Sequence, residues 1–243
     1  MKLINDILHT LDLDVGVKDV RQGLFQTAVL TRNCGLAATP HKPEHHRNAV
    51  PTIDSRHLMK KDASGLARMA LSPDGFEASI GMATINSLLD IDIQGCTEIN
   101  GRDLLIEKGR DKKIAIIGHF PFVEYLRQVA KHLWVIEKQP QNEDFDESAA
   151  ENLVPQAEVV GITGSAFINH TIEHLLAMCN TKAYVMILGP TTPISSVLFD
   201  YGADAISGTK VVDTDIVLHY VYQGVTFRQI KGVQLLTMKK ERR

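Results

Sequence analysis

The sequence predicts an α/β protein with a parallel sheet, and two observations support this. Four short runs are apolar and rich in β-branched residues, and each but the second is followed closely by a glycine and then by a helical pattern; the runs are residues 113–117, 133–136, 158–162 and 184–188. Strands that are apolar along their whole length and alternate with helices are typical of a parallel sheet covered on both faces. Ligands of such sheets bind outside the carboxyl ends of the strands, so the loops after these runs are the candidate functional loops.

The first part of the chain predicts a smaller unit of helices and a hairpin. Apolar residues recur at intervals of three and four over residues 1–13, which is the spacing of one helical face. Two β-rich stretches joined by a glycine predict a hairpin over residues 14–31. A longer helix is expected over residues 73–89, where Ser72 caps the start and Pro73 occupies the first helical position.

Length and composition indicate one or two globular domains. The chain has 243 residues, of which 44% are hydrophobic and 23% charged, and this is enough chain to bury a sizeable core. Residues 91–111 contain several glycines and charges between two regions of different character. We therefore expect a first domain of residues 1–98 and a second domain of residues 99–243.

The charge balance excludes several classes of function. The 26 Lys and Arg residues against 29 Asp and Glu residues give a net charge of −3, and no long basic block occurs, so neither nucleic acid nor a membrane surface is expected as a partner. No apolar run approaches the roughly 18 residues of a membrane span, and residues 1–16 carry too many acids for a signal peptide. A cytoplasmic location is expected. The cysteines are far apart, so we expect free buried thiols at Cys34, Cys96 and Cys179.

The loops after the first two predicted strands contain two ionisable candidates. Gly118 is followed by His119 and by the bulky Phe120, where a dinucleotide-binding loop needs further glycines, so classical NAD binding is disfavoured. Pro121 can still begin a helix whose free amides attract an anion. Glu137 ends the second strand. Three roles are compatible with its carboxylate: a contact to a ribose, a metal ligand, or a solvated acid at the end of the strand.

The third loop leads from Gly161 into a helix expected over residues 166–179. The small residues around Ser165 form either a pocket for a polar group or a simple helix cap. Inside the helix, His170 and His174 complete the His-x-x-Glu-His pattern of inverted zinc peptidases. The apolar face of the predicted helix lies opposite both histidines, so we expect them to face solvent and to bind at most a stray metal ion.

The fourth loop has two prolines around adjacent threonines. Prolines fix the backbone direction, so this loop predicts a rigid polar rim, with a plain strand-to-helix turn as the alternative. The sequence contains no nucleophile elbow, no Walker lysine and no paired carboxylates at acid–base spacing.

Taken together, these motifs resemble the family described as "putative heavy-metal chelation". The most specific stretches are Gly161-Ile162-Thr163-Gly164-Ser165 and Gly189-Pro190-Thr191-Thr192-Pro193. The resemblance implies a small α+β enolase N-terminal-like domain followed by a Rossmann-like parallel-sheet domain, with a ligand-binding cleft between them. The residues implied in that cleft are Asn33, Gly35, Asn86, Gly118, His119, Phe120, Pro121, Glu137, Thr163, Gly164, Ser165, Asn169, Gly189, Pro190, Thr191, Thr192, Pro193, Gly208 and Thr209.

The donor set of this cleft constrains the metal hypothesis. Hydroxyls, amides, one carboxylate and one imidazole are mostly hard donors that match soft heavy metals poorly, so a transition or heavy metal is expected to arrive as a complex with a small organic ligand. Softer donors occur in the loop of His41, His45 and His46 with Glu44, without regular coordination spacing.

The leading hypothesis is therefore binding of a small polar or anionic ligand, a metal ion or a metal complex in the interdomain cleft. His119 and Glu137 are its candidate catalytic or metal-binding groups. The rival hypothesis is an enzyme that acts on a nucleotide-like or adenosyl-containing small molecule, and the third is a module without a ligand. The sequence leaves the oligomeric state open, with a homodimer among the options.

Overall fold

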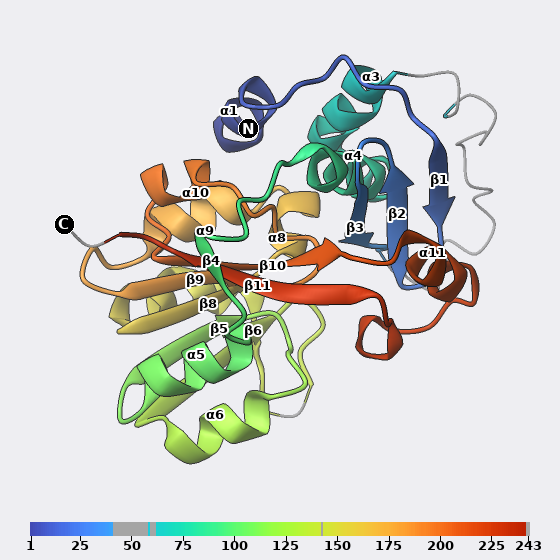
Figure 1. The fold of residues 1–243 in the computed structure, drawn as a ribbon. Coiled ribbons are helices and arrows are strands. Elements are labelled where there is room, and N and C mark those ends of the chain that lie inside the picture. The colour runs from blue at the N-terminus through green and yellow to red at the C-terminus, as the bar shows by residue number, and fades with distance from the viewer. Residues whose placement is uncertain (41–57, 59–61, 142, 242–243) are drawn as a thin grey trace.

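The protein forms two β-sheets with helices packed around them (Figure 1). The structure is a computed structural model that describes residues 1–40, 58, 62–141 and 143–241. The strands are β1 (Asp19–Gln22), β2 (Gln26–Leu30), β3 (Cys34–Ala38), β4 (Cys96–Thr97), β5 (Lys113–Ile117), β6 (His132–Glu137), β7 (Phe145–Asp146), β8 (Val159–Thr163), β9 (Tyr184–Leu188), β10 (Ala205–Val211) and β11 (Val233–Lys239). The α-helices of the described part are α1 (Lys2–His9), α3 (Ala63–Arg68), α4 (Gly75–Leu88), α5 (Gly101–Gly109), α6 (Val123–Val129), α7 (Ala150–Leu153), α8 (Ser165–Ile168), α9 (Ile172–Met178), α10 (Val197–Asp200) and α11 (Thr214–Tyr222).

The N-terminal elements follow the sequence pattern with shifted ends. Strands β1, β2 and β3 pair antiparallel, which confirms the predicted hairpin. The first strand begins at Asp19, so Val15 and Val17 precede it. Helix α1 ends at His9, short of the predicted end, and buries its apolar face.

Helix α4 is the central element of the N-terminal part and packs against β2, β3 and α3. Its predicted N-terminus needs a correction: the cap is Asp74, whose carboxylate accepts hydrogen bonds from the amides of Phe76 and Glu77. Ser72 therefore does not cap the helix directly, although its hydroxyl accepts a hydrogen bond from the Asp74 amide. The helix is buried on most of its surface, which explains its nearly uniform apolar and small-residue composition.

The larger sheet confirms the predicted α/β class. Its order is β4-β11-β10-β9-β8-β5-β6-β7. The strands from β10 to β7 pair in parallel, and β11 and β4 add antiparallel pairs at the other edge. All four predicted strands are present. The strands β10 and β11 were not predicted.

Helices cover both faces of this sheet, as Figure 1 shows for α5 and α6 on one side and for α9 and α10 on the other. Neighbouring residues of one strand point to opposite faces. On β5, Ile114 and Ile116 join a cluster with Leu104 and Leu105 of α5, whereas Ala115 joins the cluster that contains Phe167 of α8.

The two sheets are connected by packing across the predicted domain boundary. Helix α11 lies against the smaller sheet (Figure 1), where Val217 and Val221 share a buried cluster with Ala28 and Leu36. Strand β4, on the N-terminal side of residue 98, pairs with β11 at the edge of the larger sheet. The division at residue 98 stays a prediction.

None of the helices in the described part of the chain combines the length and the apolar composition that crossing a bilayer requires.

Candidate functional site

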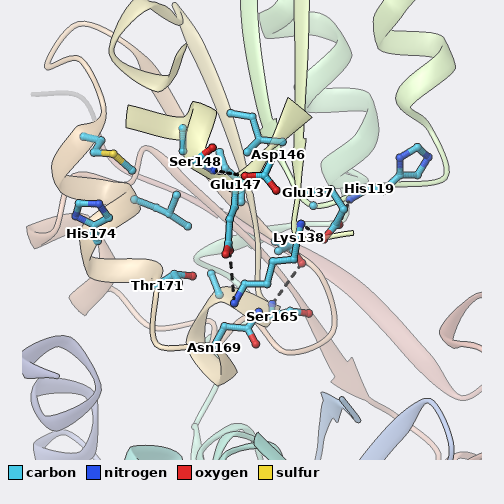
Figure 2. A pocket seen from close by; sticks show the side chains of 18 of the residues that line it. His119, Glu137, Lys138, Asp146, Glu147, Ser148, Ser165, Asn169, Thr171 and His174 are labelled. Carbon is cyan, nitrogen blue, oxygen red and sulfur yellow. Dashed lines mark hydrogen bonds and ion pairs between the residues drawn. The ribbon is translucent and has the colours of Figure 1, made fainter. Parts of the chain in front are cut away.

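A cavity of about 620 Å³ lies at the carboxyl ends of β5, β6 and β8, and Figure 2 shows it from close by. We call it the switch-point cavity, because the chain changes direction across the sheet at β5. Strand β6 lies on one side of β5, and the next long strand along the chain, β8, lies on the other side. When the six parallel strands β5 to β10 are numbered 1 to 6 along the chain, their order in the sheet, read from the β7 edge, is 3-2-1-4-5-6. Such sheets bind ligands where the order reverses, which is between β5 and β8. Its lining residues are Ile117, Gly118, His119, Phe120, Ile136, Glu137, Lys138, Asp146, Glu147, Ser148, Ala150, Glu151, Thr163, Ser165, Ala166, Asn169, Thr171, His174, Leu175 and Met178.

The backbone holds the carboxylate of Glu137 in the wall of this cavity. Its Oε2 accepts a hydrogen bond of 2.8 Å from the amide of His119, and its Oε1 accepts one of 2.7 Å from the amide of Lys138. The bond from His119 joins the loop after β5 to the end of β6, and the bond from Lys138 fixes the carboxylate against its own strand end. Because an ionised carboxylate has about four acceptor positions, Glu137 keeps capacity for a ligand.

The charge of the cavity is predominantly negative. Glu137, Asp146, Glu147 and Glu151 line it, and Lys138 is its one lysine or arginine. Hydrogen bonds from Ser148, above all from its backbone amide, hold the pKa of Asp146 below its usual value. The Lys138 ammonium lies 3.7 Å from Glu147 (Figure 2). An excess of carboxylates favours a cationic or hydroxyl-rich ligand over a phosphate.

His119 stands at the rim, held by a residue that the sequence analysis missed. Its Nδ1 donates a hydrogen bond of 2.9 Å to Oδ2 of Asp144. The Asp144 side chain is 2% exposed and that of His119 40%. In Figure 2 the imidazole points away from Lys138 and Glu147, so the backbone of His119 is closer to the cavity than its ring. Asp144 lies in an irregular loop, and no motif could have identified it.

The predicted helix over residues 166–179 is broken. Helix α8 ends at Ile168 and α9 begins at Ile172, with His170 between them at a φ of +58°. Nε2 of His170 donates a hydrogen bond of 3.0 Å to the carbonyl of Ala70. His170 is half-buried and does not face solvent as predicted, whereas His174 is exposed and lines the switch-point cavity. The two histidines therefore do not form an i, i+4 pair on one helix.

A second cavity, of about 420 Å³, contains another part of the predicted site. We call it the arginine cavity, and Phe120 lines both it and the switch-point cavity. The predicted residues Pro121, Gly189 and Pro190 are in its wall. Its lining residues are Asn100, Gly101, Arg102, Phe120, Pro121, Phe122, Tyr125, Leu188, Gly189, Pro190, Ser207, Gly208, Thr209, Phe227, Arg228 and Leu235.

The threonines of the fourth loop are buried, and Thr191 connects this loop to the N-terminal elements. Thr191 and Thr192 are 1% and 2% exposed. The Thr191 hydroxyl accepts a hydrogen bond of 2.9 Å from the amide of Ala38 in β3, and the Thr191 carbonyl accepts one of 3.2 Å from Nδ2 of Asn86 in α4. The structure thus places the Thr191 hydroxyl in a packing role instead of on an open rim, whereas Oγ1 of Thr192 is buried and has no hydrogen-bond partner among the described residues. Gly164 lies against the same loop, where an added Cβ would be 2.7 Å from the Thr192 amide, and Pro193 is buried beside it.

The residues expected from the first domain lie apart from the switch-point cavity. Asn33 and Asn86 line a cavity of about 50 Å³ with Thr209. Gly35 lets β3 approach α4, because an added Cβ would overlap the backbone of Ala83. The structure therefore distributes the predicted site over several places. His41, Glu44, His45 and His46 lie outside the described residues.

The described residues offer no metal cage. Within residues 1–40, 58, 62–141 and 143–241, no group of three or more His, Cys, Asp or Glu side chains could hold a metal ion. The three cysteines are free, and burial raises the pKa of both Cys34 and Cys179 to about 12. Metals bind the thiolate, and at neutral pH these groups are protonated thiols.

Comparison with known proteins gives the following relatives. Two family models, DUF4213 over residues 4–89 and DUF364 over residues 100–240, both carry the description "Putative heavy-metal chelation". An uncharacterized protein of Methanocaldococcus jannaschii is 28% identical over 183 residues, which cover 72% of this chain and 70% of that protein. Crystal structures of two DUF364 proteins with unknown function share the fold. The protein from Desulfitobacterium hafniense has a TM-score of 0.83 at 23% identity, and the protein from Pyrococcus horikoshii has 0.82 at 20%; both comparisons cover 98% of each chain.

Proposed function

Since the chain belongs to the family described as "Putative heavy-metal chelation", we propose that it binds a small cationic organic molecule or a cationic metal complex in the switch-point cavity. The membership confirms the resemblance seen in the sequence motifs. The proposal adds the place and the mode of binding, which the family description does not contain.

The observation that carries the proposal is the fixed carboxylate of Glu137. Its two backbone hydrogen bonds, of 2.8 and 2.7 Å, orient it before a ligand arrives, so little side-chain freedom is lost on binding. Three further carboxylates line the same cavity. Charge-assisted hydrogen bonds from a cationic ligand to such groups are about twice as strong as neutral ones.

The donor set favours recognition of a complete complex over direct coordination. Soft metals select thiolate and thioether ligands. The cavity has mainly carboxylates and hydroxyls, with the thioether of Met178 and the exposed imidazole of His174 besides the rim residue His119. A complex with its own chelating ligand needs only hydrogen bonds and opposite charge from the protein. The metal is then the cargo of the protein and not a resident cofactor.

The proposed location differs from the interdomain cleft that the resemblance implies. The residues that line the switch-point cavity lie between positions 117 and 178. They belong to the part that we expect to be Rossmann-like, and the strand order supports that description. Asn33, Gly35 and Asn86 would then contribute to packing around β3 and α4, apart from the site.

One observation favours a second candidate, binding of a nucleoside or an adenosyl compound. Glu137 ends the second strand of the 3-2-1-4-5-6 order, the position from which an acidic residue binds a ribose in dinucleotide-binding sheets. Phe120, in place of a further glycine, argues against the pyrophosphate of a dinucleotide. A nucleoside without phosphates fits both facts.

Hexaamminecobalt(III) is a suitable first probe, because its inert ammine ligands permit hydrogen bonds and exclude coordination to the protein. Binding is measured by calorimetry for the native protein, Glu137→Gln and Glu124→Gln. The control residue, Glu124, is an exposed glutamate of α6 that lines neither cavity. We expect Glu137→Gln to weaken binding at least tenfold and Glu124→Gln to leave it within twofold. Equal effects of both variants, or no binding, would contradict the proposal.

Two further measurements separate the alternatives. Adenosine replaces hexaamminecobalt(III) in the same titrations, and binding that depends on Glu137 would favour the nucleoside. Elemental analysis of tag-free protein purified without chelator is then compared for the native protein, Glu137→Gln and the control Glu124→Gln. Metal that persists in Glu124→Gln and disappears with Glu137→Gln supports the proposal. Metal that both variants retain lies outside the switch-point cavity and argues against it.

A further inference from the structure

We infer that the protein has a second small-molecule site, for a planar aromatic anion, in the arginine cavity. This site is separate from the proposed function of the switch-point cavity, which it adjoins at Phe120. Two features of its wall carry the inference: its charge and its aromatic rings.

The charge of the arginine cavity is opposite to that of its neighbour. Arg102 and Arg228 line it, and none of its lining residues is Asp or Glu. Nε of Arg102 donates a hydrogen bond to the adjacent Asp103, which leaves the terminal nitrogens of its guanidinium for a ligand. Arg228 is exposed and forms no ion pair within the part of the chain that the structure describes. Guanidinium groups bind carboxylates through two parallel hydrogen bonds.

Aromatic and apolar side chains form much of the remaining wall. Phe120 and Phe122 stack with ring centroids 5.1 Å apart and planes at 23°. Tyr125 is 57% exposed and Leu235 is 37% exposed, and both border the cavity. Flat rings offer stacking to a flat ligand, and burial of this exposed surface favours binding through the hydrophobic effect.

Thr209 lines this cavity and also the cavity of about 50 Å³ that contains Asn86. Oγ1 of Thr209 and Oδ1 of Asn86 are both buried and have no hydrogen-bond partner among the described residues, so this hydroxyl does not single out the arginine cavity. Two arginines and flat apolar walls together fit an aromatic ring that bears a carboxylate.

The probe is 2-naphthoate, and 2-naphthamide is its neutral match of nearly the same shape. Binding of both is measured by calorimetry to the native protein and to Arg102→Gln/Arg228→Gln. Arg68→Gln is the control, because Arg68 is an exposed arginine of α3 that lines neither cavity. All three substitutions are at exposed or half-exposed side chains, so folding is expected to be retained, and circular dichroism checks this.

We expect 2-naphthoate to bind at least tenfold more tightly than 2-naphthamide to the native protein, and the double variant to lose this preference. Arg68→Gln should leave the binding of 2-naphthoate within twofold. Equal binding of both probes, unchanged binding to the double variant or no binding of 2-naphthoate would each overturn the inference.

Discussion

Nδ1 of His119 lies 2.9 Å from Oδ2 of Asp144, and this bond ties the loop after β5 to the loop after β6. The Asp144 carboxylate also accepts a hydrogen bond of 3.1 Å from the amide of Gln141, and Glu137 accepts one from the amide of His119. Three bonds to two carboxylates therefore shape the rim of the switch-point cavity before a ligand is present. Asp144 does not line the cavity, so it acts through the position of His119.

The first prediction concerns this rim. Asp144→Ala removes the acceptor of the His119 ring and of the Gln141 amide, so we expect the free energy of unfolding in urea to fall by about 1–3 kcal/mol. The control is Glu143→Ala, because the Glu143 side chain is 74% exposed in its ion pair with Arg127 and such pairs contribute about 1 kcal/mol or less. A loss for Asp144→Ala no greater than that of the control would contradict the structural role of the bond.

The break between α8 and α9 leads to a second prediction. His170 has a φ of +58°, which glycine adopts freely and alanine only with strain of about 1–2 kcal/mol. Both His170→Ala and His170→Gly lose the bond to Ala70, so the difference between them isolates the backbone. We expect the glycine variant to be more stable than the alanine variant by about 1 kcal/mol in thermal or urea unfolding.

A continuous helix over residues 166–179 would give the opposite result, because glycine inside a helix is about 1 kcal/mol less stable than alanine. The same comparison at Ala177, an exposed residue of α9, serves as the internal reference. There Ala177→Gly should destabilise the protein by that amount.

The limits of prediction from the sequence are explained by particular contacts. The strands β5, β6, β8 and β9 are apolar runs, and local pattern was enough to locate them. The strand β10 was missed in part because Gly208 interrupts its pattern, and that glycine is required where an added Cβ would be 2.8 Å from the carbonyl of Thr192. The break at His170 depends on Ala70, which is 100 positions away in the chain. No local pattern contains these partners.

The candidate site was also predictable only in part. The loops after the strands led to Gly118, Glu137 and Ser165, all of which line the switch-point cavity. The exposed acids of that cavity, such as Glu147, lie in a stretch without periodicity and were missed. Thr191 was expected to face a ligand. Its hydrogen-bond partner, the Ala38 amide, is 153 positions away in the chain, so no local pattern could predict the contact.

The third prediction separates packing from ligand binding at Gly35, one of the residues that the family resemblance placed in the cleft. An added Cβ at Gly35 would overlap backbone atoms of Ala83 and Ser87 in α4, and backbone cannot move aside as a flexible side chain can. We expect Gly35→Ala to lower the free energy of unfolding by about 3 kcal/mol or more. Gly16→Ala, where nothing lies within 4 Å of the added atom, should change it by less than about 1 kcal/mol. A Gly35→Ala protein with normal stability that no longer binds hexaamminecobalt(III) would instead indicate a ligand contact at Gly35.

The last prediction concerns stability at alkaline pH. Burial raises the pKa of the Cys34 and Cys179 thiols to about 12, whereas in the unfolded chain they titrate near 9. Above about pH 9 the unfolded state loses these protons and the folded state keeps them, so the folded state binds more protons and its stability falls as the pH rises toward 12. Below pH 9 both states are protonated, and this contribution to stability is complete.

We therefore expect the free energy of unfolding in urea to fall less between pH 8 and pH 10.5 in Cys34→Ala than in the native protein. Lysines and tyrosines titrate in the same range in both proteins, so the difference between the two losses measures the thiol alone. An identical loss in Cys34→Ala would show that the thiol ionises in the folded state as readily as in the unfolded chain.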